Sequence, residues 1–176
     1  GWDSYRAIAS HPAVDWELPL SLGDSHRGFA VLGTSAGYFQ RFRHGDGEAL
    51  RFREGNAFGG VFEVVLGSEV AQRLGYRLGD SITLNHGMSE LGPAHGDKPF
   101  RVVGILAATG TPVDRTLHVS LEAISALHLD WVGGAPLPGV NIPAEFVAKF
   151  DLKPKEITAA LVGLKQRGDV FRMQRF

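Results

Sequence analysis

The segment 62–121 constrains the fold more than any other part of the chain, because short apolar runs alternate there with glycine-bearing turns. Residues 64–66 (Val-Val-Leu) form an apolar run of the kind that favours a short strand. Ser68 can cap a helix that continues to Leu74, and Gly75 can adopt the left-handed conformation that ends it. The pattern therefore predicts a strand, a short helix and a helix stop in quick succession.

The rest of this segment predicts three further strands and a second helix. In residues 81–85, polar and apolar side chains alternate, as they do in a strand with one buried face. Residues 100–106 are almost entirely apolar, which predicts a more deeply buried strand. Residues 116–121 resume as a strand after a Thr-Gly-Thr-Pro turn, and Ser120 can cap a helix that reaches about His128. We expect a β-rich unit with two small helices.

The first third of the chain predicts helix, strand, loop, strand and helix in that order. After an amphipathic helical start, apolar and polar side chains alternate over residues 14–18, and we expect this strand to end before Pro19. A second strand is expected over residues 27–32. Thr34 or Ser35 would then cap a helix that carries three aromatic residues.

The last third of the chain is less regular. Residues 131–143 are rich in glycine and proline, which predicts an excursion over the surface. Pro143 fits the first position of a short helix that reaches about Phe150. Residues 157–164 are compatible with either a helix or a strand, because their periodicity does not separate the two.

Composition narrows the class of protein. The chain has 176 residues and 44% hydrophobic content, which is enough for one or two small globular units. A net charge of −1 gives no electrostatic reason to expect a nucleic-acid partner, and the absence of cysteine excludes disulfides and thiol chemistry. No apolar stretch of about twenty residues is present, which taken alone predicts a soluble cytosolic chain. However, both ends lie inside amphipathic patterns, so the chain looks trimmed, and if the two ends point to the same side both can continue into membrane helices.

A set of short glycine motifs points to one family. The motifs are Gly55, Gly67, Leu74-Gly75, Gly79-Asp80 and Val103-Gly104. As a set they resemble the extracytoplasmic (MacB-type periplasmic core) domain of MacB/FtsX/LolC-like ABC transporter permeases, and the resemblance is strongest over residues 54–128.

This resemblance implies an α+β fold with two subdomains. A porter-like α/β subdomain would be formed by the chain ends, residues 1–53 and 150–176, and a mostly β subdomain over residues 54–130 would be inserted into it. Residues 131–149 would form the Gly/Pro-rich excursion and a short helix. The resemblance also favours a strand for residues 157–164.

The resemblance further implies a non-catalytic domain without cofactors, located in the periplasm as part of an inner-membrane protein. It would couple cytoplasmic ATP hydrolysis to movement of a substrate, or to activation of a partner, in the periplasm. The implied partners are an ATP-binding subunit, a second permease copy in a homodimer, and a periplasmic or lipoprotein partner. The expected partner or cargo contact is the loop that contains Thr111, Pro112, Val113, Asp114 and Arg115.

A zinc-binding periplasmic module is the alternative. His86, Glu90, His95 and Asp97 lie in one polar loop, and imidazoles with carboxylates can hold zinc. Their spacing matches no fixed zinc motif, and a solvated loop is the simpler interpretation.

Three other motifs favour structural roles over enzyme chemistry. Ser68 lacks the second glycine of a nucleophile elbow, and a helix cap would explain it. Gly59-Gly60 is not followed by the Gly-Lys-Ser/Thr of a phosphate-binding loop. Asp114 and Arg115 are expected to form an ion pair that stabilises the turn.

Overall fold

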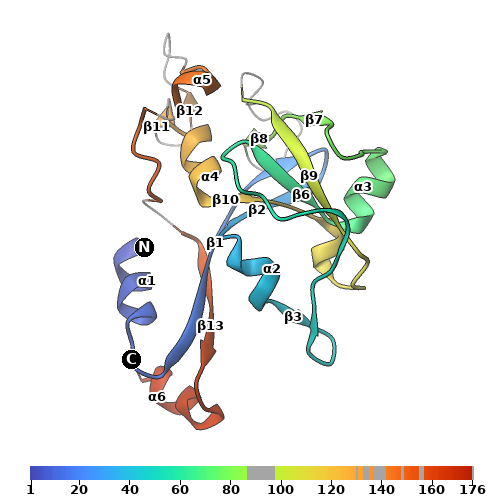
Figure 1. Cartoon of the computed structure of the whole chain (residues 1–176). Helices are drawn as coiled ribbons and strands as arrows, with labels where there is room; N and C mark the ends of the chain where they lie inside the picture. Colours follow the sequence, from blue (N-terminus) through green and yellow to red (C-terminus); the bar gives the residue numbers. More distant parts are fainter. Residues whose placement is uncertain are drawn as a thin grey trace.

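A mixed sheet with strand order β13-β1-β2-β10-β6-β9-β5 organises the molecule (Figure 1). The computed structural model describes residues 1–86, 98–129, 131–132, 135–136, 142–147, 149–154 and 157–175. The short strands β7 and β8 pair with β9 and β1, and two small hairpins, β3-β4 and β11-β12, lie outside the main sheet. The α+β class expected from the sequence is confirmed.

The strands alternate with short helices along the chain. The strands are β1 (Val14–His26), β2 (Phe29–Thr34), β3 (Arg43–His44), β4 (Glu48–Ala49), β5 (Phe52–Gly55), β6 (Glu63–Leu66), β7 (Ser81–Ile82), β8 (Asn85–His86), β9 (Phe100–Leu106), β10 (Thr116–Ser120), β11 (Trp131–Val132), β12 (Ala135–Pro136) and β13 (Ala159–Leu164). The helices are α1 (Trp2–Ala9), α2 (Gly37–Arg41), α3 (Ser68–Leu74), α4 (Leu121–Leu127), α5 (Ala144–Val147) and α6 (Val170–Met173), with 3-10 turns η1 (Pro112–Arg115) and η2 (Arg167–Asp169).

The local signals for α3 and α4 give the correct helices but only one correct N-cap. Gly75 ends α3 with φ 71°, as predicted, and the Ser120 side chain accepts a hydrogen bond from the Ala123 amide at 3.0 Å. Ser68 does not cap α3, because Gly67 holds the cap position. A Cβ at Gly67 would lie 2.2 Å from the Val113 carbonyl oxygen, so close backbone approach excludes a larger residue there.

The caps predicted for α2 are also wrong. This helix begins at Gly37 after Ala36, and its N-cap makes no side-chain hydrogen bond. Thr34 instead donates its hydroxyl hydrogen bond to the Pro19 carbonyl at 3.0 Å, so its side chain serves the neighbouring strand.

β1 is much longer than the sequence predicts, because it passes through Pro19 and continues to His26. The Leu20 carbonyl accepts from the Thr158 amide on the β13 side, so the adjacent Pro19 points its backbone to the other side. On that side the Pro19 carbonyl accepts a hydrogen bond from the Thr34 hydroxyl. The N–H that proline lacks would have no strand partner there among the described residues, so no backbone hydrogen bond is lost. Proline therefore does not end the strand.

The main sheet is covered on both faces. One face packs against α3 and α4, and the other packs against α2. The first cluster consists of Phe29, Val31, Val64, Leu66, Val70, Ala71, Ile82, Leu84, Phe100, Val102, Ile105, Leu117, Val119, Ala123 and Leu127. The second consists of Leu18, Leu32, Tyr38, Phe39, Leu50, Phe58, Val65, Leu106 and Val113.

Most of the segment 157–164 forms a strand, β13 (Ala159–Leu164), as the family resemblance suggested. β13 pairs antiparallel with the first half of β1, and together they form a two-stranded ribbon that extends from the sheet with α1 beside it (Figure 1). The second half of β1 pairs with β2 inside the main sheet. The division into subdomains at residues 53, 130 and 150 remains a prediction.

Candidate partner-contact site

The loop between β9 and β10 is held by one buried carboxylate. Asp114 accepts hydrogen bonds from the Thr109 amide at 2.8 Å, the Gly110 amide at 2.8 Å and the Thr109 hydroxyl at 3.0 Å. Burial alone would raise the pKa of Asp114, but the bonds from Thr109 and Gly110 outweigh it and hold this pKa below its usual value. The loop therefore has a defined shape with a charge at its centre.

The five predicted contact residues divide by exposure. Val113 and Asp114 are buried, Thr111 is half-buried, and Pro112 and Arg115 are exposed. Thr111 caps η1 by accepting a hydrogen bond from the Val113 amide. The inner residues therefore fix the position of the outer ones, and Pro112 and Arg115 form the accessible part.

The ion pair expected between Asp114 and Arg115 does not form, because Arg115 pairs with another carboxylate. Arg115 donates to Glu69 on α3 at 2.7 Å, and Arg73 on the same helix donates to the same carboxylate oxygen at 2.9 Å. The Arg115 guanidinium also lies 5.4 Å from the ring centroid of Phe29 at the start of β2. The loop is thus fixed to both α3 and β2.

The β1–β2 hairpin adds a feature that the sequence analysis missed. Its two-residue turn is Arg27-Gly28, and both residues have positive φ. Beside the turn, His26 donates from Nδ1 to the Thr83 carbonyl at 2.6 Å, so its Nε2 accepts from the Tyr76 hydroxyl at 2.8 Å. Burial lowers the pKa of His26, which favours the neutral ring that this arrangement requires.

A second buried histidine lies on the opposite face of the main sheet. His118 on β10 is fully buried, with its ring centroid 5.3 Å from that of Tyr38 and 5.7 Å from that of Phe39. Burial lowers the pKa of His118 to about 4 and raises that of Tyr38 to about 12. Its Nε2 meets no hydrogen-bond partner among the residues that the structure describes.

The predicted metal ligands fall mostly outside the described residues. Glu90, His95 and Asp97 lie in the part of the chain that the structure does not describe, and only the backbone of His86 is placed, opposite Asp24 in the β1–β8 ladder. His128 Nε2 lies 3.6 Å from a carboxylate oxygen of Asp24. Within the described ranges, no three His, Asp or Glu side chains are grouped as a metal site.

The enzyme motifs have structural explanations in the fold. The Ser68 hydroxyl contributes to the lowered pKa of Asp114, so this serine lies close enough to support the charge in the loop. The amides of Gly59 and Gly60 both donate to Glu63 at 2.8 Å, and these bonds lower the pKa of that carboxyl. The amides are therefore already engaged, in agreement with the exclusion of a phosphate loop.

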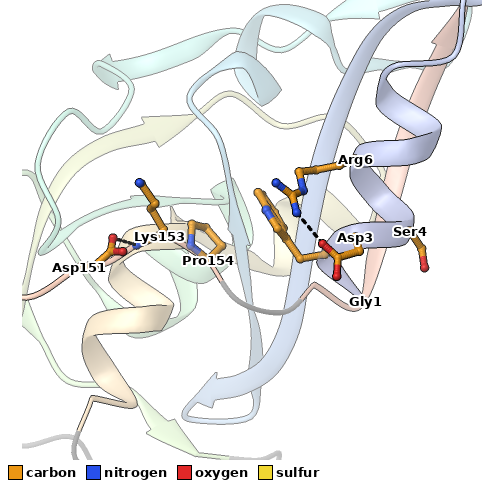
Figure 2. Close-up of a pocket in the computed structure, with 8 residues that line it drawn as sticks. Gly1, Asp3, Ser4, Arg6, Asp151, Lys153 and Pro154 are labelled. Atoms are coloured by element: carbon orange, nitrogen blue, oxygen red, sulfur yellow. Dashed lines mark hydrogen bonds and ion pairs between the residues drawn. The ribbon is translucent and has the colours of Figure 1, made fainter.

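A surface cavity of about 610 Å³ lies between the start of α1 and the segment 151–154 (Figure 2). Two of its carboxylates are already engaged: Asp3 accepts from Arg6 at 2.6 Å, and Asp151 accepts from the Lys153 amide. The cavity thus presents paired polar groups rather than a set that converges on a ligand. Its lining residues are Gly1, Trp2, Asp3, Ser4, Arg6, Asp151, Lys153 and Pro154.

The comparisons with known proteins agree with the fold. Residues 4–147 match the model of the MacB-like periplasmic core domain family, so the chain belongs to this family. It is therefore an extracytoplasmic domain of a MacB-like ABC transporter, and the whole transporter requires an ATP-binding partner. Among the described helices, none is long and apolar enough to cross a membrane.

The fold is similar to that of one solved transporter domain, and a second structure aligns less closely. The extracellular domain of the noncanonic ABC-type transporter YknZ from Gram-positive bacteria aligns over 97% of this chain and 76% of that one, with 10% identity and a TM-score of 0.55. The periplasmic region of MacB from Actinobacillus actinomycetemcomitans aligns over 99% and 81%, with 14% identity and a TM-score of 0.49. No curated protein sequence matches the chain.

Proposed function

We propose that this domain transmits motion between the membrane part of its transporter and a partner or cargo outside the cytoplasm. In this role it performs no chemistry of its own, and ATP hydrolysis occurs on the cytoplasmic partner. The proposal requires a continuous rigid connection from one end of the domain to a contact site at the other.

The course of β1 is the observation that carries the proposal. This strand pairs with β13 over its first half and with β2 over its second half. β2 pairs in turn with β10, whose first residue directly follows Arg115 of the contact loop. One hydrogen-bonded path therefore connects the ribbon, beside which both chain ends lie in Figure 1, to the loop.

The contact loop has the stiffness that such a role requires. Asp114 binds two backbone amides within the loop, and Arg115 binds Glu69 on α3. A displacement of the sheet would therefore be passed on to the exposed Pro112 and Arg115, because the loop would deform little. We assign partner or cargo contact to the segment 111–115 on these grounds, and pairing with a second permease copy to the subdomain formed by the chain ends.

The test interrupts the hydrogen-bonded connection in the complete transporter and leaves both the ribbon and the contact loop in place. Two glycines inserted into β1 after Leu22, where its register with β2 shifts, should leave ATP hydrolysis intact and abolish transport or partner activation. The same insertion between Gly45 and Gly47, in the exposed β3–β4 turn, serves as the control and should have no effect. Full transport with the β1 insertion would overturn the proposal.

Zinc binding is the second candidate, and one observation favours it. The strand register pairs Asp24 with His86, and His128 lies beside Asp24, so the histidine loop starts next to an acid and an imidazole. Zinc titration of the chain should detect one site that is lost in the double variant His86→Ala, His95→Ala. Equal zinc affinity in this variant and in the unmodified chain would remove the candidate.

A further inference from the structure

The tip of the β1–β2 hairpin carries an arginine in a conformation that arginine rarely adopts. Arg27 has φ 47°, and it is the one non-glycine residue with positive φ among the described residues. A two-residue turn with both φ values positive favours Asn-Gly or Gly-Gly, so the chain accepts a less suitable residue here. Such an exception in an exposed position suggests a role for the side chain itself.

Two further arginines lie on separate elements, one of them directly against this hairpin. Arg115 from η1 stacks over Phe29, which is paired with His26 across the turn. Arg73 from α3 shares the Glu69 carboxylate with Arg115.

The three elements that carry these arginines are fixed to one another. His26 of the hairpin bonds to Tyr76, which lies three residues after Arg73. Arg115 bonds to Glu69 of α3. The backbone positions of the three arginines are therefore fixed relative to one another by contacts between their elements.

The charges of this surface do not cancel. One carboxylate, Glu69, is shared by Arg73 and Arg115, whose side chains are 61% and 52% exposed. Arg27 is exposed and forms no ion pair with any residue that the structure describes. An excess of positive charge thus remains on a chain whose net charge is −1.

We infer that Arg27, Arg73 and Arg115 form a docking surface for an acidic segment of a protein partner. The inference rests on the proposed function, because Arg115 is also the exposed end of the contact loop. Guanidinium groups donate several N–H bonds to carboxylates, and Glu69 already binds one N–H from each of two of the three arginines through a single oxygen. Clusters of arginine are a recurrent means of recognising acidic motifs.

A protein partner fits this surface better than an anionic membrane does. Charge-based recognition of anionic lipid uses clusters of about four to eight basic residues, whereas this surface has three arginines, two of which share Glu69. The arginines are also held at fixed positions on three elements, which suits a partner with a defined arrangement of carboxylates.

The test compares two variants of equal charge. The surface variant combines Arg27→Gly, Arg73→Gln and Arg115→Gln. The control combines Arg41→Gln, Arg51→Gln and Arg167→Gln, three exposed arginines in other segments of the chain. Glycine adopts positive φ without strain, so Arg27→Gly alone should fold at least as well as the unmodified chain.

The probe is a fluorescently labelled oligoglutamate peptide, and binding is followed by its anisotropy. We expect binding at about 0.02 M salt that weakens at about 0.15 M. The surface variant should bind at least about tenfold more weakly, and the control variant should bind like the unmodified chain.

Three results would overturn the inference. They are an absence of peptide binding at low salt, an equal loss in both variants, and stronger arginine-dependent binding to vesicles of phosphatidylglycerol than to the peptide. The insertion in β1 tests the proposed function independently. If transport fails with that insertion, motion transfer is supported, whatever the result of the peptide experiment.

Discussion

The main sheet, which runs from the second half of β1 to β5, and the ribbon formed by β13 and the first half of β1 are both held by backbone hydrogen bonds. They differ in how far their side chains are buried. In β6 and β10 most side chains are buried, and Val64, Leu66 and Leu117 are 0% exposed. In β13 no side chain is buried. Since local stability follows burial and contact with neighbouring elements, the ribbon should open at a lower free energy than the sheet.

With this difference, the domain would be rigid at its proposed contact site and adjustable near its chain ends. The sheet is fixed by apolar layers on both faces. The ribbon depends on its backbone pairing, on a few side chains such as Trp16 and Leu161, and on α1. Four predictions test the contrast.

The largest effect should come from removing buried volume in the sheet. Leu117→Ala deletes a fully buried side chain at the centre of β10, and we expect a loss of about 3 kcal/mol in the free energy of unfolding. Leu164→Ala removes the same atoms from the partly exposed ribbon and should cost about 1 kcal/mol. Urea denaturation of both variants measures the difference, and equal losses would contradict the contrast.

The second prediction concerns pH and is specific to the sheet. The pKa of His118 falls from 6.5 to about 4 on burial, so the unfolded chain binds its proton more readily than the folded chain. This contribution to stability is complete above pH 6.5 and is lost as the pH falls toward 4, by up to about 3 kcal/mol.

His118→Leu isolates this contribution. The variant should lose less stability than the unmodified chain between pH 7 and pH 4.5, as measured by denaturant titration at both values. The carboxyls of Asp114 and Glu63 also have lowered pKa values and lose stabilisation in acid, but they do so in both proteins. Parallel pH profiles of the two proteins would show that His118 is not buried and neutral.

The third prediction targets the ribbon. A Cβ at Gly163 would lie 2.2 Å from the indole ring of Trp16 on β1, so the ring must move in Gly163→Ala. We expect a cost of about 1–2 kcal/mol. Hydrogen exchange should locate the loss in β1 and β13, while the main sheet remains protected. Gly168→Ala, where the added Cβ meets no neighbour, should leave exchange unchanged, and faster exchange across the main sheet in Gly163→Ala would argue against separate stabilities.

The smallest effect is expected at the junction between ribbon and sheet. The Thr158 hydroxyl accepts from the Leu22 amide at 3.0 Å and donates to the Leu20 carbonyl at 3.2 Å. Thr158→Val keeps the shape and removes both bonds, which should cost about 1 kcal/mol. Thermal unfolding measures the loss, and an unchanged midpoint would mean that water replaces the hydroxyl without cost.

The parts of the fold that the sequence predicts are those set by local chemistry. Gly75 can stop a helix wherever it occurs, and Ser120 satisfies an amide three residues away, so α3 and α4 follow from short motifs. The strand β9 follows from its apolar run. These elements carry their own start and stop signals.

The errors concern residues whose role depends on distant neighbours. Pro19 remains inside β1 because its nitrogen faces away from β13, where no described strand pairs with β1 at this residue. The pairing with β13 determines this orientation. Thr34 bonds to a neighbouring strand rather than to its own helix. Arg115 chooses Glu69 over the adjacent Asp114 because the fold already engages Asp114 with backbone amides.

The candidate site was predictable only in part. The segment 111–115 was selected from the family resemblance, and its sequence shows a turn but does not reveal which side chains are exposed. Arg27 carries no sequence signal of its own, since the positive φ and its neighbours appear only in three dimensions. The metal candidates other than the backbone of His86 lie outside the described residues, so that prediction stands untested.

The long course of β1 gives the domain a directional response to force. Antiparallel hydrogen bonds lie perpendicular to their strands, so a displacement along β1 strains all of its bonds to β13 together. A sideways displacement instead opens these bonds one after another from an end. The ribbon should therefore behave as a stiff rod when it is pushed or pulled along its length, and as a compliant hinge when it is bent.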